Sequence, residues 1–120
     1  LVEDNALNAE IAAALLADRG VSVELARDGS EAVRMFREAP AGTYAGIIMD
    51  IMMPVMDGLT ATRAIRALER ADAKTIPIIA MTANAFEEDA RQCLAAGMNV
   101  HLAKPLCMEE LVAILARLCA

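Results

Sequence analysis

The stretch Gly46–Gly58, with the sequence GIIMDIMMPVMDG, places one carboxylate, Asp50, at the end of an apolar run and directly before a methionine-rich loop. Moving a lone ionised carboxylate into apolar surroundings costs much free energy unless its charge is neutralised. The run from Tyr44 to Met49 is typical of a buried strand. Asp50 should therefore stand at the carboxyl end of that strand and need a partner that offsets its charge.

Outward from this stretch, apolar strand-like runs alternate with segments of helical periodicity. The expected strands are residues 1–2, 21–26, 44–49, 76–81 and 100–103, each followed by a helix. Such alternation predicts an α/β fold with a parallel sheet, right-handed crossovers and helices on both faces, which means a three-layer doubly wound domain. Two residues are too few for a strand, so we expect one domain, residues 1–120, whose first strand is truncated at its N-terminus.

Local signals mark several helices. Leu7, Ile11 and Leu15 are spaced by four and predict the first helix. Ser30 is the expected N-cap of the second helix, and Gly97 is the expected stop of the helix that precedes the last strand.

The composition argues against several classes of function. Hydrophobic residues make up 58% of the chain and aromatic residues 2%, which predicts an aliphatic core, and the net charge of −6 argues against a general nucleic-acid-binding surface. No apolar run approaches the roughly 18 residues of a membrane span, and no leader suggests secretion. Three cysteines without a CxxC pair, together with one histidine, predict no zinc-type cluster and fit a reducing cytoplasm.

Polar residues follow the expected strands at their carboxyl ends. Glu3 and Asp4 follow the first strand, Asp50 the third, Thr82 the fourth and Lys104 the fifth. In a parallel sheet these ends lie along one edge, where α/β folds bind their ligands. The five side chains should therefore meet in one pocket.

This expected pocket combines three carboxylates with a hydroxyl and an ammonium group. Clustered like charges raise carboxylate pKa values unless a cation intervenes. Mg²⁺ fits best, because it binds through one or two carboxylates, water and a phosphate oxygen. Thr82 and Lys104 suit a phosphoryl group, so the set predicts phosphoryl transfer onto a carboxylate oxygen, that of Asp50.

Each residue taken alone has an ordinary structural explanation. Asp4 could cap the first helix, and Asp57 could simply mark a turn and the start of the helix that follows it. Thr82 could be a helix cap, and Lys104 could be a surface lysine beside a proline. The functional interpretation depends on the whole set, because chance rarely places polar residues at four of five strand ends.

The same residues resemble the signature of the response-regulator receiver domain of two-component signalling. The matching motifs are Glu3-Asp4-Asn5, Asp50 with Met53-Pro54 and Asp57-Gly58, Met81-Thr82-Ala83 and Ala103-Lys104-Pro105. The resemblance covers essentially the whole chain and implies a flavodoxin-like (βα)5 receiver fold with sheet order 2-1-3-4-5. Residues 82–85 and 97–99, the latter running on to Lys104-Pro105, further resemble receivers fused to hybrid sensor histidine kinases.

The resemblance also implies roles. Asp50 would be the phosphoacceptor, and Asp4, Asp50 and the backbone carbonyl of Met52 would ligate Mg²⁺, with Glu3 assisting through water. The donor would be a histidine kinase or a histidine phosphotransfer domain. The domain would act in the cytoplasm without contacting nucleic acid or membrane, and it would not be a turnover enzyme, although it would catalyse its own phosphorylation and dephosphorylation.

Further implied roles concern signalling. Thr82 and Lys104 would hold the phosphoryl group, and Thr82 would move toward it as a switch. The aromatic switch position of the family is His101 here, which fits either a switch residue or a partly exposed strand histidine. Met52 and Asn84 would tune the lifetime of the phosphoryl group, and the apolar Met52 predicts slow self-dephosphorylation.

Three other classes of protein are alternatives to a phosphorylated receiver. A haloacid-dehalogenase-type phosphatase would want a second Asp two residues after the nucleophile, where Met52 stands. Flavodoxin-like cofactor binding would want a phosphate loop rich in Gly, Ser or Thr after the first strand, and the sequence has none there. The main alternative is a degenerate receiver that binds partners without phosphorylation, but its mark would be a lost acidic, Thr or Lys element, and none is lost.

Overall fold

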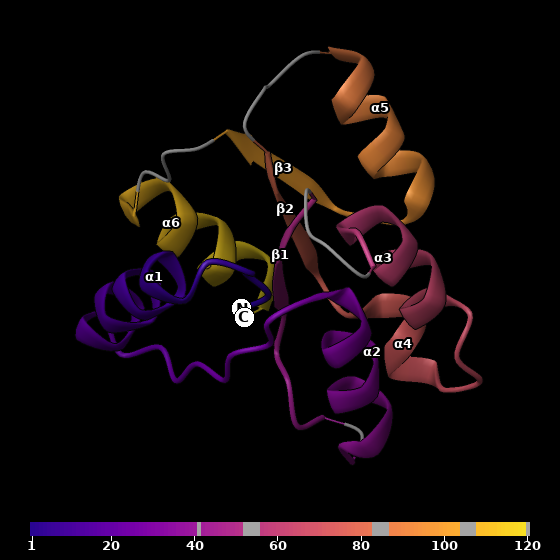
Figure 1. The fold of residues 1–120 in the computed structure, drawn as a ribbon, viewed down its shortest axis with the longest axis horizontal. Coiled ribbons are helices and arrows are strands. Elements are labelled where there is room, and N and C mark those ends of the chain that lie inside the picture. Colours follow the sequence, from indigo (N-terminus) through magenta and orange to yellow (C-terminus); the bar gives the residue numbers. More distant parts are fainter. Residues whose placement is uncertain (41, 52–55, 83–86, 104–107, 120) are drawn as a thin grey trace.

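The computed structural model describes residues 1–40, 42–51, 56–82, 87–103 and 108–119. The elements in chain order are α1 (Ala6–Asp18), α2 (Gly29–Glu38), β1 (Ile47–Asp50), α3 (Gly58–Arg66), α4 (Ala71–Thr75), β2 (Ile78–Thr82), α5 (Glu87–Ala96), β3 (Val100–Ala103) and α6 (Met108–Cys119). Helices α1 and α6 lie on one side of the sheet, and α2, α3, α4 and α5 lie on the other (Figure 1). This is the predicted three-layer α/β arrangement.

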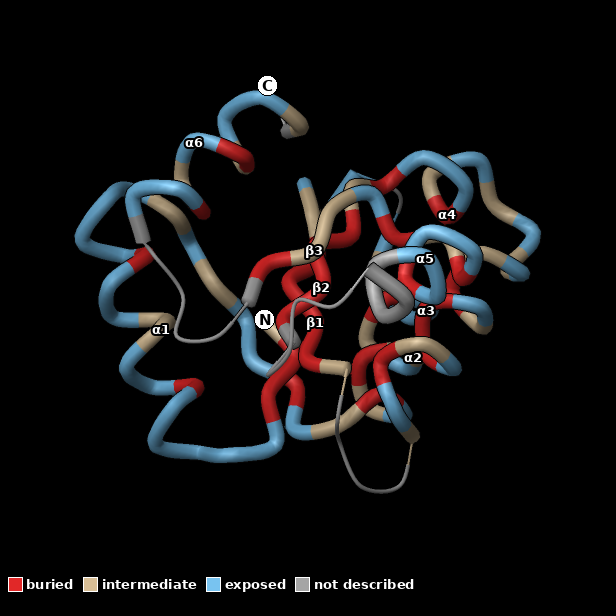
Figure 2. Tube along the Cα trace, turned by 90° about the horizontal axis from the view of Figure 1, so that it is seen from above, coloured by how far each residue is buried: buried red, intermediate tan, exposed pale blue. Residues whose placement is uncertain are grey.

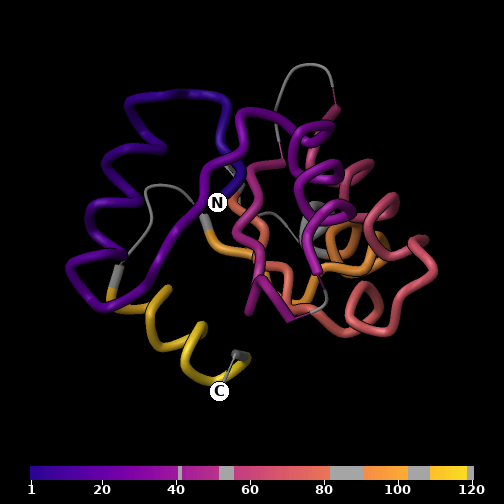
Figure 3. Tube along the Cα trace, turned by 90° about the horizontal axis from the view of Figure 1, so that it is seen from below, coloured from indigo at the N-terminus to yellow at the C-terminus, as the bar shows by residue number. Residues whose placement is uncertain are grey.

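The sheet is parallel and runs in the order β1-β2-β3. Beside β1, Val2 forms two single parallel bridges, one with Met49 and one with Ala26. Residue 2 thus lies between Ala26 and β1. The N-terminus accordingly lies at the middle of the molecule, between the two helical layers (Figure 3).

Of the five expected strands, three are strands in the described residues, and the other two are represented by the two single bridges of Val2. Residues 21–25 take part in two backbone hydrogen bonds there, from the Val21 amide to the Leu16 carbonyl and from the Leu1 amine to the Glu24 carbonyl. A strand requires a continuous ladder with a neighbour, and this segment has one only at its end. The alternating sequence alone therefore does not make residues 21–26 a strand.

Two apolar clusters fill the space on either side of the sheet. One contains Phe36 of α2, Ile65 of α3 and Ile78 of β2, and the other contains Leu16 of α1 and Ile79 of β2. Neighbouring strand residues such as Ile78 and Ile79 belong to opposite clusters because successive side chains point to opposite faces. The strands form the buried centre of the molecule (Figure 2).

The first helix forms where its periodicity predicts it, but the leucine spacing does not mark its buried face. Leu7, Ile11 and Leu15 are 65%, 51% and 42% exposed, whereas Ala9 and Leu16 are buried. This helix is rich in alanine, and small side chains make part of its contact with the core. Among the described helices, none is long and apolar enough to cross a membrane.

Helix α2 begins two residues earlier than predicted. Its N-cap is Asp28, not Ser30, because the Asp28 carboxylate accepts the Glu31 amide at 2.9 Å. Gly29 is then the first helical residue, and its amide donates to the Met56 carbonyl at 3.1 Å. The short helix α4 was not predicted at all.

Candidate functional site

Asp50 is the last residue of β1 and is only 3% exposed. Its backbone is held from two sides. The Asp50 amide donates to the Val2 carbonyl at 3.0 Å, and the following amide, that of Ile51, donates to the Met81 carbonyl at 3.1 Å. Asp50 therefore has a fixed position at the carboxyl end of the sheet, where the sequence predicts it.

Glu3 and Asp4 follow Val2, which lies beside β1, and so they lie at the same edge of the sheet as Asp50. The Glu3 amide donates to the Ala26 carbonyl at 3.0 Å, which ties the segment after Val2 into the sheet. Carboxylate oxygens of Glu3, Asp4 and Asp50 all lie within 4.8 Å of one another. Glu3 and Asp50 are buried and Asp4 is exposed, so the structure confirms that three carboxylates converge and places one of them at the surface.

The helix-cap explanation applies to Asn5 and not to Asp4. The Asn5 side chain accepts the Asn8 amide at 3.0 Å and is the N-cap of α1. The Asn5 amide in turn donates to a Glu3 carboxylate oxygen at 3.3 Å, which orients that side chain. Asp4 is therefore not needed to start the helix, and its carboxylate belongs to the cluster.

The chemistry of this cluster suits a hard cation. Three carboxylates this close repel one another, and two of them are buried, where water screens their charges poorly. Oxygen ligands of this kind are the ones Mg²⁺ prefers. Among the described residues, this is the one group of three or more carboxylate, histidine or cysteine side chains with metal-binding spacing. Glu3, Asp4 and Asp50 are thus the residues that could hold a metal.

Gly58 is a positioning residue that the sequence analysis did not identify. A Cβ atom at this position would lie 2.4 Å from the Asp50 carbonyl oxygen and 2.9 Å from the Cα atom of Ile51. The Gly58 amide donates to the Ile51 carbonyl at 2.9 Å, and its own carbonyl accepts the hydroxyl of the buried Thr62 at 2.8 Å. The start of α3 therefore packs directly against the backbone of Asp50, an approach that only glycine allows.

Asp57, directly before Gly58, has the ordinary role that its sequence suggests. Its side chain accepts the Thr60 amide at 2.8 Å and caps α3. The dipeptide Asp57-Gly58 thus serves two purposes, a cap and a close approach, and sequence reasoning recognised only the first.

Thr82 ends β2 on the same carboxyl edge, where its Cα pairs with that of Ala103, while Asp50 pairs with Met81 on the adjacent strand. His101 lies in the middle of β3, is partly buried and pairs with Ala80. Its partial burial fits both interpretations of this histidine. The predicted roles of Met52, Asn84 and Lys104 concern residues that lie outside the described ones.

Comparisons with known proteins agree with this geometry. A family model described as response regulator receiver domain matches residues 1–116. The chain is 40% identical over 123 residues to the osmosensing histidine protein kinase SLN1 of Saccharomyces cerevisiae, an alignment that covers 100% of this chain and 10% of that protein. The curated relatives are long proteins, and the chain spans between 3% and 16% of their length.

Solved structures give the same result. The receiver domain of the sensor histidine kinase PA1611 from Pseudomonas aeruginosa, which has a magnesium ion coordinated in its active site cleft, matches with a TM-score of 0.87 and 46% identity over 98% of this chain and 93% of that one. The co-crystal structure of the yeast histidine phosphotransfer protein Ypd1 with the receiver domain of the response regulator Ssk1 matches with a TM-score of 0.83 and 28% identity, over 98% of this chain and 85% of that one.

Proposed function

Because the chain belongs to the response regulator receiver family, we propose that Asp50 is the residue that accepts the phosphoryl group in two-component signalling. The observation that carries this proposal is the convergence of three carboxylates at one sheet edge, with Asp50 buried at the end of strand β1 and carboxylate oxygens of Glu3 and Asp4 within 4.8 Å. Such an arrangement fixes the orientation of the Asp50 carboxylate and forms a binding site for a cation beside it.

The reaction is a displacement at phosphorus. One carboxylate oxygen of Asp50 attacks the phosphorus of a phosphohistidine, so that an O–P bond forms while the P–N bond breaks, and the imidazole nitrogen keeps the electron pair and takes a proton from water. Mg²⁺ bound by Asp4, Asp50 and the carbonyl of Met52, with Glu3 assisting through water, would offset the negative charge of the carboxylates and of the phosphoryl oxygens. Position and electrostatics supply most of the catalysis in such transfers.

The remaining site residues act on the phosphoryl group after transfer. We assign the Thr82 hydroxyl a hydrogen bond to a phosphoryl oxygen and the Lys104 ammonium group an ionic contact with another. Phosphorylation adds negative charge and acceptor oxygens, which would draw Thr82 inward and change the surface formed by α5, β3 and α6. His101 on β3 is the candidate second switch residue, and Asn84 is a candidate for tuning the lifetime.

The proposed donor is a phosphohistidine protein, either a histidine kinase or a histidine phosphotransfer domain. The yeast complex of Ypd1 with the Ssk1 receiver domain supports this choice, since that receiver has the same fold. We further propose that the domain acts in the cytoplasm, contacts neither nucleic acid nor membrane directly, and turns over no substrate apart from its own phosphorylation and dephosphorylation. The net charge of −6 agrees with the absence of a nucleic-acid surface.

The test is incubation of the chain with acetyl phosphate, with and without Mg²⁺, followed by intact-mass measurement. We expect a phosphoryl adduct that requires Mg²⁺ and is lost in Asp50→Asn. The matched control is Asp57→Asn, which changes a carboxylate in the same loop that only caps α3 and should keep the adduct.

Two results would overturn the proposal. An adduct that persists in Asp50→Asn would show that another residue accepts the phosphoryl group. No adduct in the wild type, together with unchanged binding of a phosphotransfer protein, would favour the degenerate receiver that binds partners without phosphorylation.

A further inference from the structure

Arg66 is the last residue of α3, and its guanidinium group contacts three other segments of the chain. It donates twice to the Gly97 carbonyl, through Nε at 3.0 Å and through a terminal nitrogen at 2.8 Å. It also donates to the Ala73 carbonyl at 3.0 Å and to the side-chain oxygen of Asn99 at 3.1 Å. One side chain thus connects α3 with α4, with the residue that follows α5 and with the residue that precedes β3.

The C-terminal end of α5 is fixed by these contacts and by its own turn. Gly97 has a φ of +110°, its amide donates to the Leu94 carbonyl at 3.1 Å, and the Met98 amide donates to the Cys93 carbonyl at 3.0 Å. Cys93 and Met98 are both buried. A Cβ atom on Gly97 would lie 2.9 Å from Cγ of Arg66, so the glycine gives the arginine room to approach.

Arg66 also supplies a positive charge that α5 lacks at this end. The last turn of α5, residues 93–96, contains no basic residue. Carbonyl groups at a helix C-terminus carry partial negative charge, which a nearby cation stabilises. Arg66 is partly buried, so water screens this attraction less than it would at the surface. The planar guanidinium group bonds to several carbonyls at once, and a lysine ammonium group does not reproduce this geometry.

The two ends of α5 are joined to opposite edges of the sheet. At its N-terminal end, α5 begins at Glu87, five positions after Thr82 ends β2 at the edge that carries the carboxylate cluster. At the other end, the Asn99 amide donates to the Ile78 carbonyl at 2.8 Å, and the Asn99 side chain accepts the Ile78 amide at 2.9 Å. The C-terminal end of α5 lies beside α3, and its N-terminal end points away from α3 (Figure 1).

We propose that Arg66 is a positioning residue of the phosphorylation switch: it fixes the C-terminal end of α5, so that phosphorylation of Asp50 displaces the N-terminal half of α5 about Gly97. This inference rests on the proposed function, which supplies the phosphoryl group. Strands β2 and β3, which precede and follow α5, are paired in one parallel ladder. The helix therefore responds at the end that is joined to Thr82, while the sheet and the contact with α3 stay in place.

The test is residue-by-residue amide exchange measured by NMR, with Mg²⁺ and with or without beryllofluoride, which mimics an aspartyl phosphate. In the wild type, we expect the amide resonances of residues 87–92 to shift, while exchange at Gly97 and Met98 stays within about twofold. In Arg66→Lys, the Gly97 and Met98 amides should exchange about tenfold faster, and beryllofluoride should then change their exchange by about threefold or more. A purely structural role would give only the first of these two effects.

The matched control is Arg70→Lys, because Arg70 has the same kind of contact with the C-terminal end of α2. Its guanidinium group donates to the carbonyls of Phe36 and Ala39, both at 2.9 Å, and lies over the Phe36 ring. We expect both lysine variants to lose stability, and the C-terminal end of α5 to respond to beryllofluoride in Arg66→Lys alone. Equal responses in the two variants would show general loosening and would overturn the proposal.

A milder variant, Asn99→Ala, tests the same contacts if Arg66→Lys does not fold. It removes one acceptor of Arg66 and leaves the two bonds to Gly97, so exchange at Gly97 and Met98 should rise by about threefold and should then depend on beryllofluoride. Exchange at these two amides that does not depend on beryllofluoride in the variant would overturn the proposal.

The wild-type spectra separate this inference from the proposed function. Binding of beryllofluoride is detected at the Asp50 and Ile51 amides and should be lost in Asp50→Asn. No binding in the wild type would overturn the proposed function and this inference with it. Binding that leaves the resonances of residues 87–92 unshifted, or that changes exchange at Gly97 as strongly as in Arg66→Lys, would overturn this inference alone.

Discussion

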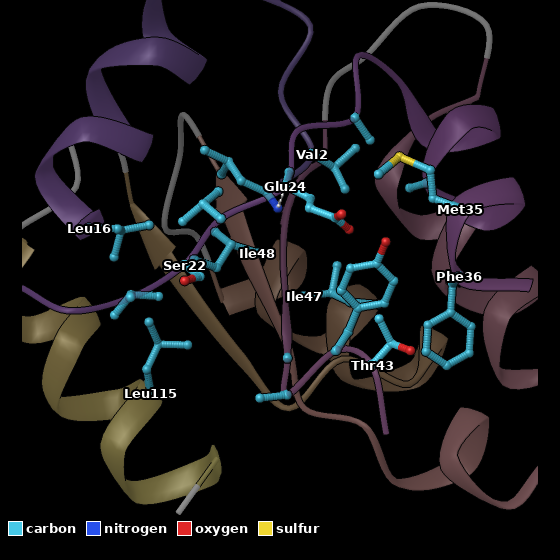
Figure 4. Close-up of a pocket in the computed structure, with 18 of the residues that line it drawn as sticks. Val2, Leu16, Ser22, Glu24, Met35, Phe36, Thr43, Ile47, Ile48 and Leu115 are labelled. Carbon is cyan, nitrogen blue, oxygen red and sulfur yellow. Dashed lines mark hydrogen bonds between the residues drawn. The ribbon is translucent and has the colours of Figure 1, made fainter. Parts of the chain in front are cut away.

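The two ends of the sheet differ in how completely they are packed. At the carboxyl end, Asp50 and Glu3 are tied by backbone hydrogen bonds to their neighbours, and Gly58 approaches so closely that a methyl group has no room. At the amino end, a cavity of about 620 Å³ separates segments that lack strand pairing (Figure 4). The comparison teaches that the carboxylate geometry depends on close contacts with a few residues beside Asp50.

The largest effect on stability should come from adding a side chain at Gly58, at the closely packed carboxyl end of the sheet. In Gly58→Ala, the new methyl group would meet the Asp50 carbonyl oxygen, and overpacking of this kind costs about 2–3 kcal/mol of unfolding free energy. Because the clash displaces the backbone of Asp50, Mg²⁺ affinity should fall as well. Chemical denaturation and metal titration measure the two effects.

The matched control for this variant is Gly20→Ala. Gly20 has a φ of +82° and no atom within 4 Å of its missing Cβ, so the substitution strains the backbone by about 1–2 kcal/mol without touching the site. We expect unchanged Mg²⁺ affinity in Gly20→Ala. Equal loss of Mg²⁺ affinity in both glycine variants would show that general instability, and not the close approach at Asp50, explains the effect.

A smaller effect separates the metal-binding and capping roles of two adjacent residues. Asn5→Ala removes the N-cap of α1 and should cost about 1 kcal/mol of stability with little change in Mg²⁺ affinity. Asp4→Asn removes a carboxylate from the cluster and should lower Mg²⁺ affinity about tenfold or more while stability stays level or rises slightly. The reverse pattern would assign Asp4 to the helix and remove it from the site.

The smallest effect concerns the phosphoryl lifetime. Met52 is apolar and cannot orient an attacking water molecule, so Met52→Asn should shorten the phosphoryl half-life several-fold, a barrier change below about 1.4 kcal/mol. Loss of the adduct over time, followed by intact mass after removal of acetyl phosphate, gives the rate. A half-life equal to that of the wild type would remove Met52 from the residues that tune dephosphorylation.

The sequence predicts the convergence of Glu3, Asp4 and Asp50 because a parallel sheet brings all carboxyl strand ends to one edge, whatever lies between them. The alternating sequence predicts a strand over residues 21–26, but in the structure only Ala26 of this segment forms a bridge. Strand formation depends on pairing with a neighbour and not on alternation alone. The sequence also does not reveal that Gly58 touches the Asp50 backbone, since that contact depends on the path of the intervening loop.

Two errors within helices have similar causes. Asp28 and Ser30 are both good N-cap residues two positions apart, and the structure shows that Asp28 is the cap because its carboxylate accepts the Glu31 amide. In α1, Leu7, Ile11 and Leu15 are spaced by four but are exposed, whereas Ala9 and Leu16 are buried. Periodicity alone therefore does not identify the buried side of this helix.

The most direct test of the central claim is the location of the phosphoryl group. After phosphorylation with acetyl phosphate and Mg²⁺, reduction with borohydride converts an aspartyl phosphate to homoserine, which peptide mass spectrometry can place in the sequence. We predict homoserine at position 50, and at no other acidic position, in the phosphorylated chain. Homoserine at Asp4, Asp57 or another carboxylate, with Asp50 unmodified, would contradict the account.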